Sequence, residues 1–207
     1  MKNAVIDDEK TISNIVLKYE SALQMLETQL KILIKEYEVE NKYNPVEHIK
    51  SRIKSIESAT TKLKRKGYEV SVDNLIKHVH DMVGIRIVCS FLPDIYALVE
   101  AIEQSNFIEI IEKKDYISLP KDSGYTSYHL IVKIPIHLSK GIEEVEAEIQ
   151  IRTMAMDFWA SLDHKIQYKF SEEIPLEVRD EMYKCAMDIK NLDHKMMALN
   201  HIVKYYK

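Results

Sequence analysis

The feature that most constrains this chain is a strand of strict two-residue alternation that ends at Arg152. In the segment 143–152, E-E-V-E-A-E-I-Q-I-R, apolar residues alternate with charged and amide residues. Because successive side chains of a strand point to opposite faces of a sheet, one face of this strand is apolar. The other face presents carboxylate, amide and guanidinium groups in succession, from Glu144, Glu146, Glu148, Gln150 and Arg152.

The strand is followed by A-M-D-F-W-A-S-L, which predicts a helix packed beside it. Thr153 is placed to cap this helix. The spacing predicts that Phe158 and Trp159 point inward and that Asp157 points to the opposite side. With a helix beside it, the polar face of the strand need not be open to solvent.

Composition favours a folded protein of one large domain, or one domain with a helical extension. The 207 residues are 46% hydrophobic and 30% charged. The net charge of −4 argues against a protein that coats nucleic acid, so no stable nucleic-acid complex is expected. Cys89 and Cys185 fit neither a disulfide framework nor a zinc pattern. No apolar run approaches the roughly 20 residues that span a bilayer, and the first ten residues lack the core of a signal peptide. We therefore expect a cytoplasmic protein without a membrane segment.

The remaining pattern predicts the order α-α-α-β-α-β-β-β-α-α. Amphipathic helices are expected at both ends, over Asp8–Asn41 and Pro175–Lys207. Asn44-Pro45 is typical of a helix start and predicts a second helix that runs to Lys66-Gly67. Strands are expected over 81–91, 106–116, 128–136 and 143–152. This order predicts an α+β fold, in which helices flank a small mixed sheet.

A basic row lies on the predicted second helix. Lys54, Ser58, Lys62 and Arg65 recur at spacings that keep them on one helical face, and Arg52 lies nearby. Several cationic donors on one face can bind a polyphosphate. A solvated lysine face is the alternative interpretation.

Two further residues mark the first strand as part of a site. Arg86 projects from an otherwise apolar strand and needs a partner, which an aromatic base, a phosphate or a structural ion pair would supply. Asp81 lies where the chain enters this strand. Together with Glu148, and with Glu146 as a possible addition, it could hold Mg²⁺, which takes one or two carboxylates with water and substrate phosphates. Ordinary surface carboxylates are the alternative.

The loop L-P-K-D-S-G-Y-T-S-Y-H gathers aromatic and basic groups around a turn. Tyr125 follows Gly124, and its ring could stack on a base or fold onto the core. Lys121 and His129 flank it. The chain has no G-x-x-x-x-G-K-[ST] or G-x-G-x-x-G motif, so side chains must hold any nucleotide. H-V-H-D at 78–81 lacks the additional histidines of a metal phosphohydrolase, so hydrolase chemistry is not expected.

Four blocks in this order resemble the small alarmone synthetases, stand-alone relatives of the Rel/SpoT (p)ppGpp synthetases. The blocks are S-R-I-K-S-I-E-S with K-L-K-R-K-G, H-D-M-V-G-I-R-I-V-C-S-F, K-D-Y-I-S-L-P-K-D-S-G-Y-T-S-Y-H and A-E-I-Q-I-R-T-M-A-M-D-F-W-A-S-L-D-H-K. N-P-V-E-H-I-K-S-R and A-M-D-F-W-A-S-L are similar to the RelP branch in particular. The resemblance implies a nucleotidyltransferase-like fold, with a helical extension, a catalytic domain and a C-terminal helix over 1–44, 45–170 and 171–207.

The resemblance also implies an activity. Members of the family transfer the β,γ-pyrophosphate of ATP to the 3′-hydroxyl of GDP or GTP, with Mg²⁺, and make (p)ppGpp and AMP in the stringent response. No metal hydrolase domain precedes the four blocks, so hydrolysis of the product is not implied. Relatives form homotetramers, and the two long terminal helices exceed what a small sheet needs for cover. We therefore expect a homo-oligomer, with a tetramer as in relatives.

Residue roles follow from the same resemblance by position. The implied ATP-binding residues are Arg52, Lys54, Ser58, Lys62, Arg65 and Arg86. Asp81 and Glu148 are implied to hold Mg²⁺, and Glu148 is also placed to draw the proton from the 3′-hydroxyl. The residues implied to bind the GDP or GTP acceptor are Lys121, Tyr125, His129, Gln150 and Asp157.

Two positions depart from the family pattern. Thr126 stands where many relatives carry arginine, and Asp157 replaces the asparagine of some relatives, so hydrogen bonding there must differ. A catalytically silent nucleotide- or RNA-binding regulator on the same fold is the alternative from another functional class. A nucleotidyltransferase that releases pyrophosphate in place of AMP is a further rival.

Overall fold

The computed structural model of this chain describes residues 9–167, 170, 174–204 and 206. Along the chain it has α1 (Glu9–Asn41), β1 (Val46–Ile53), α2 (Ile56–Arg65), α3 (Val72–His78), β2 (Val83–Cys89), α4 (Leu92–Gln104), β3 (Glu109–Asp115), β4 (Tyr128–Leu138), β5 (Gly141–Thr153), α5 (Met154–Gln167) and α6 (Leu176–Lys204). The predicted outer ends of the terminal helices, Asp8 and Lys207, lie outside the described residues.

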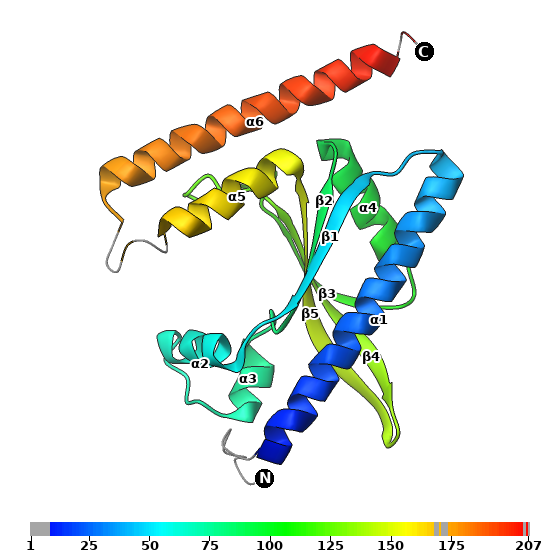
Figure 1. Cartoon of the computed structure of the whole chain (residues 1–207), viewed down its shortest axis with the longest axis vertical. Helices are drawn as coiled ribbons and strands as arrows, with labels where there is room; N and C mark the ends of the chain where they lie inside the picture. Colours follow the sequence, from blue (N-terminus) through cyan, green and yellow to red (C-terminus); the bar gives the residue numbers. More distant parts are fainter. Residues whose placement is uncertain (1–8, 168–169, 171–173, 205, 207) are drawn as a thin grey trace.

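The five strands form one mixed sheet in the order β1-β2-β5-β4-β3. β2 and β5 pair in parallel, whereas the other neighbours are antiparallel. Figure 1 shows α1 and α4 on one side of the sheet, while α5 and α6 lie together on the other side and α2 and α3 lie beyond one end. The predicted α+β class with a small mixed sheet is confirmed.

The first terminal helix is part of the core. Ala22, Leu26 and Leu30 of α1 are fully buried, and the helix contacts β1, β2, β4 and β5. Its apolar stripe therefore packs on the sheet of its own chain. None of the helices in the described part of the chain is long and apolar enough to cross a membrane.

The segment after Pro45 is a strand, so the prediction that a helix starts there is wrong. β1 pairs antiparallel with β2, and a bulge interrupts the register between Val46 and His48. The bulge places Val46 and Ile49, three residues apart, on the same half-buried face, and Ile53 follows four residues later, so the spacings resemble those of a helix. The helix begins only at Ile56.

Candidate functional site

The strand register places the predicted site residues of three strands on one face of the sheet. In the parallel pair of β2 and β5, Gly84 lies beside Glu148 and Arg86 beside Gln150. Arg52 of β1 lies opposite Gly84. Since paired residues share a face, two arginines, a carboxylate and an amide converge there. Gly84 has no side chain, so it leaves space between Arg52 and Glu148.

A cavity of about 260 Å³ opens on this face. Its lining includes Arg52, Asp81, Gly84, Arg86, Glu148 and Gln150. The structure thus brings both predicted metal carboxylates together with two of the predicted ATP-binding arginines. The Nε of Arg86 is buried and has no hydrogen-bond partner among the described residues. An unpaired buried donor costs about 1–3 kcal/mol, which an acceptor atom on a ligand would offset.

Asp81 is held by two lysines. Its carboxylate accepts hydrogen bonds from Lys54 Nζ at 2.9 Å and from Lys62 Nζ at 2.8 Å. Burial raises the pKa of Asp81, but the hydrogen bonds and charges of Lys62 and Lys54 outweigh burial and lower it. Asp81 is therefore ionised at neutral pH, with two ammonium groups at its oxygens.

The predicted basic row is only partly assembled, because its first member does not lie on a helix. Lys54 precedes α2, where its backbone N–H donates to Met82 O, and Ser55 is the residue that caps the helix. Lys62 reaches Asp81 from within α2. Ser58 and Arg65 are exposed on the same helix and do not line the cavity.

Glu148 is the carboxylate at the centre of the polar face of β5. It accepts hydrogen bonds from His129 Nδ1 at 2.9 Å and from Gln150 Nε2 at 2.7 Å. Burial raises the pKa of Glu148, as does the nearby charge of Asp81, but the interactions with His129 and Gln150 prevail and lower it. Glu148 is therefore an ionised base whose position is fixed by two neighbours.

A continuous polar network extends from Glu148 to the loop between β3 and β4. The hydroxyl of Tyr125 lies 2.8 Å from His129 Nε2 and accepts a hydrogen bond of 2.5 Å from Arg152 Nη2. Arg152 also donates to Gln150 Oε1 at 3.0 Å. Sequence reasoning did not assign Arg152 to the site, although it lies on the same polar face of β5.

Asp157 joins this network to the arginine of β2. Its Oδ1 lies 3.0 Å from Arg86 Nη1 and 3.2 Å from Arg152 Nη1. Asp157 is 8% exposed, whereas Phe158 is 61% exposed. The predicted orientation of this helix is therefore wrong for both residues, because two guanidinium groups hold the carboxylate inside, while Trp159 is buried as predicted.

Lys121 lies over two aromatic rings of the same loop. Its Nζ is 4.6 Å from the centroid of the Tyr116 ring and 4.9 Å from that of Tyr125. The guanidinium carbon of Arg152 is 5.1 Å from the Tyr125 centroid. Tyr125 is thus half-buried among cations, so it packs inward as one interpretation predicted.

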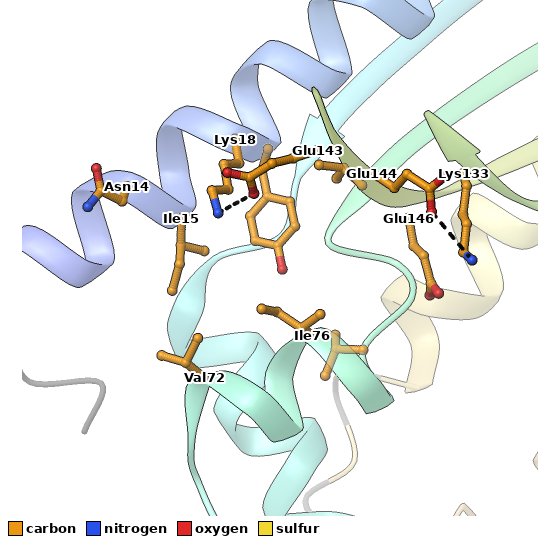
Figure 2. Close-up of a pocket in the computed structure, with 12 residues that line it drawn as sticks. Asn14, Ile15, Lys18, Val72, Ile76, Lys133, Glu143, Glu144 and Glu146 are labelled. Atoms are coloured by element: carbon orange, nitrogen blue, oxygen red, sulfur yellow. Dashed lines mark ion pairs between the residues drawn. The ribbon is translucent and has the colours of Figure 1, made fainter. Parts of the chain in front are cut away.

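A second cavity, of about 350 Å³, lies between α1, α3 and the hairpin of β4 and β5 (Figure 2). Its apolar walls include Ile15, Val72 and Ile76. Two ion pairs line it, Lys18 with Glu143 and Lys133 with Glu144. Glu146, the possible addition to the metal carboxylates, lines this cavity and not the cavity of Asp81 and Glu148, whereas the other predicted site residues do not line it.

Comparison with known proteins gives one consistent result. A family model described as a region found in RelA and SpoT proteins matches residues 51–173. The GTP pyrophosphokinase YwaC of Bacillus subtilis is 46% identical over 198 residues, which is 94% of each chain. The crystal structure of small alarmone synthetase 2 from B. subtilis has a TM-score of 0.82 at 46% identity and covers 91% of this chain and 97% of its own. That of small alarmone synthetase 1 from the same organism, bound to its product pppGpp, has a TM-score of 0.87 at 32% identity, with 95% and 100% covered.

The ion pairs of Asp81 with Lys54 and Lys62 predict how the free energy of unfolding depends on pH. Because they lower the pKa of Asp81 in the folded state, its carboxylate stabilises the fold at pH values above its ordinary value of 3.8, and this contribution is lost as the pH falls through the folded-state value. The variant Asp81→Asn lacks the contribution. The difference in unfolding free energy from wild type, measured by urea unfolding, should therefore be largest at neutral pH and shrink below pH 3.8.

The exposed Asp188 on α6 offers a matched control for this measurement. Asp188→Asn should leave the unfolding free energy close to that of wild type across the same range. A difference for Asp81→Asn that stayed constant with pH would contradict the proposed role of the two lysines.

Proposed function

The chain belongs to the RelA/SpoT family, and from this membership we infer that it is a GTP pyrophosphokinase. It transfers the β,γ-pyrophosphate of ATP to the 3′-hydroxyl of GDP or GTP, and forms (p)ppGpp and AMP. The observation that carries the proposal is Glu148, an ionised carboxylate fixed by His129 and Gln150 at a cavity lined by arginines. Such a group can take the proton of the attacking hydroxyl.

On the donor side, cations gather around the place where we propose that ATP binds. Arg52 and Arg86 line the cavity, and the unpaired Nε of Arg86 is available to an acceptor on the ligand. Lys54 and Lys62 both point their ammonium groups at Asp81. Phosphoryl transfer depends on positioning and charge neutralisation more than on covalent chemistry, so Lys54 and Lys62 suit the phosphates of the donor, while Arg52 and Arg86 would flank its adenine. Ser58 and Arg65, on the exposed face of α2, would reach the outer phosphates.

We propose that Asp81 and Glu148 hold Mg²⁺. Both carboxylates line one cavity, both have lowered pKa values, and the charge of Asp81 opposes the ionisation of Glu148. A cation between them would relieve this repulsion. No cluster of three or more His, Cys, Asp or Glu side chains suited to a metal occurs in the described residues. Mg²⁺ commonly takes one or two carboxylates and completes its shell with water and substrate phosphates, where it neutralises charge.

On the acceptor side, we propose that the guanine nucleotide binds beside the acceptor loop, residues 116–127 between β3 and β4. Tyr125 would stack on the guanine, and Lys121 and His129 would contact the phosphates. Gln150 and Asp157 would lie by the nucleoside. The hydrogen bond from His129 to Glu148 supports this arrangement, because it links the acceptor groups directly to the proposed base. As both substrates are cytoplasmic nucleotides, we place the reaction in the cytoplasm, as part of the stringent response.

Glu148→Gln should keep the fold and lose at least about 100-fold in turnover, since an amide cannot accept the proton. Thin-layer chromatography of labelled ATP, incubated with GDP or GTP and Mg²⁺, measures (p)ppGpp and AMP together. Glu144→Gln is the matched control, because this exposed carboxylate lies on the same face of the same strand.

The same assay separates the rival functions. Release of pyrophosphate in place of AMP would indicate an ordinary nucleotidyltransferase. A wild-type chain that binds nucleotide but transfers nothing would be a silent regulator. Near-normal turnover of a folded Glu148→Gln would remove this residue from the mechanism.

Tyr125→Ala should raise KM for the acceptor by about tenfold or more, since stacking on a base contributes on the order of 1–3 kcal/mol. KM for ATP should change little. Tyr125→Phe is the informative control: it keeps the ring but lacks the hydroxyl that contacts His129 and Arg152. Steady-state kinetics with each substrate varied decides the assignment, and an effect confined to the ATP constant would refute it.

We also propose that the chain forms a homo-oligomer, a tetramer, through α6. Leu192, Met196, Leu199 and Val203 lie along one stripe of this helix and are each about half exposed. An apolar stripe of this kind suits a symmetric contact with a second copy. Light scattering at micromolar concentration should give a multiple of 24.2 kDa, and Leu199→Glu should lower that mass. His201→Glu, on the opposite side of α6, is the control; a wild-type mass of one chain would disprove assembly.

A further inference from the structure

The N-terminal half of α6 lies against the acceptor loop, at Gly124. A Cβ built on Gly124 would lie 2.5 Å from the Cβ of Ala186, which is closer than real side chains approach, and 3.4 Å from the ring of Tyr183. Gly124 also has a φ of +84°, in the left-handed region that favours glycine. Ala186 is 6% exposed. The loop and the helix are therefore in direct contact, with no space for a larger group between them.

Two hydrogen bonds fix α6 to the catalytic side of the fold. Asp193 Oδ2 accepts a hydrogen bond of 2.8 Å from Thr153 Oγ1, at the end of β5 and directly after Arg152. The carbonyl of Met182 accepts one of 3.2 Å from the indole Nε1 of Trp159. Ala186 and Asp193 are seven residues apart, which places them two turns apart on one side of the helix. α6 is thus attached to α5 and β5 on both sides of its contact with the loop.

The contact at Gly124 leads directly to the proposed acceptor groups. Tyr125 is the next residue, and its hydroxyl contacts His129 and Arg152. The ring of Trp159 lies 6.5 Å from that of Tyr125, between centroids. A shift of α6 toward or away from Gly124 therefore moves the backbone that carries Tyr125.

We propose that α6 positions the acceptor loop, with Ala186 and Asp193 as positioning residues that set the affinity for the guanine nucleotide. This inference rests on the proposed function, since it takes Tyr125 to contact the acceptor. The donor cations come from β1, β2 and the α2 region, whereas the main packing partners of α6 among the described residues are α5 and α4. α6 therefore acts on one substrate and not on the other.

Ala186→Leu tests the proposal, because a branched side chain at this position forces the loop away from α6. KM for GDP should rise by about tenfold or more, with KM for ATP within about twofold of wild type. Ala198→Leu is the matched control, since Ala198 is exposed on the same helix. Circular dichroism verifies that each variant remains folded.

Trp159 gives a second readout that needs no catalysis. It is the single tryptophan of the chain, it is 5% exposed, and it contacts both α6 and Tyr125. Titration of its fluorescence with GDP and with an ATP analogue should show weaker GDP binding in Ala186→Leu and unchanged binding of the analogue. If wild type proves unable to transfer pyrophosphate, this titration still decides whether α6 controls guanine-nucleotide binding.

A second pair of variants covers the case in which Ala186→Leu unfolds. Asp193→Ala removes the acceptor for Thr153 and should weaken GDP binding selectively, whereas Asp193→Asn keeps an acceptor oxygen and should restore it. Equal loss for both nucleotides, or unchanged GDP binding in folded variants of both positions, would overturn the proposal.

Discussion

The parallel pairing of β2 with β5 is the constraint on which the site depends. Their register places Gly84 beside Glu148 and Arg86 beside Gln150. On the opposite face the same strands carry fully buried isoleucines, among them Ile87 and Ile151, which belong to one core cluster with buried residues of α1 and α4. A shift by one residue would exchange the two faces and bury the charges in the core. The hydrophobic packing of α1 against the sheet therefore fixes the positions of polar groups that it never touches.

Ion pairing explains how so many charges are tolerated in one place. Asp81 faces two ammonium groups, and Asp157 faces two guanidinium groups. Each carboxylate is thus outnumbered by cations, which offsets the cost of burying it and leaves positive charge in excess on either side of Glu148. An excess of positive charge attracts a polyphosphate. It is also compatible with an ionised base, because Glu148 remains deprotonated between the two groups.

Patterns over neighbouring residues correctly predicted the features of the fold that depend on neighbouring residues alone. The alternation of β5 correctly identified the polar face, and the lone Arg86 in an apolar strand correctly indicated a partner, which is Asp157. β1 was mistaken for a helix because Asn44-Pro45 is typical of a helix start and because Ile49 and Ile53 are four residues apart, a spacing that fits one face of a strand as well as one face of a helix. Hydrophobicity also placed Phe158 inside and Asp157 outside. Asp157 is buried because Arg86 of β2 and Arg152 of β5 pair with its carboxylate. The period of its own helix gives no information about these partners.

Arg152 shows where sequence reasoning stops. It completes the polar series of β5, so the alternation was sufficient to nominate it, but a terminal arginine on a strand is usually exposed. Here it is 4% exposed, and its partners include Asp157 and a tyrosine 27 residues away. That tyrosine, Tyr125, packs inward and still presents a ring beside two cations. The sequence left two interpretations of Tyr125, a ring folded onto the core or a ring that binds a ligand. A ring held by its hydroxyl can do both, because the hydrogen bonds that bury the edge of the ring also fix the orientation of its face.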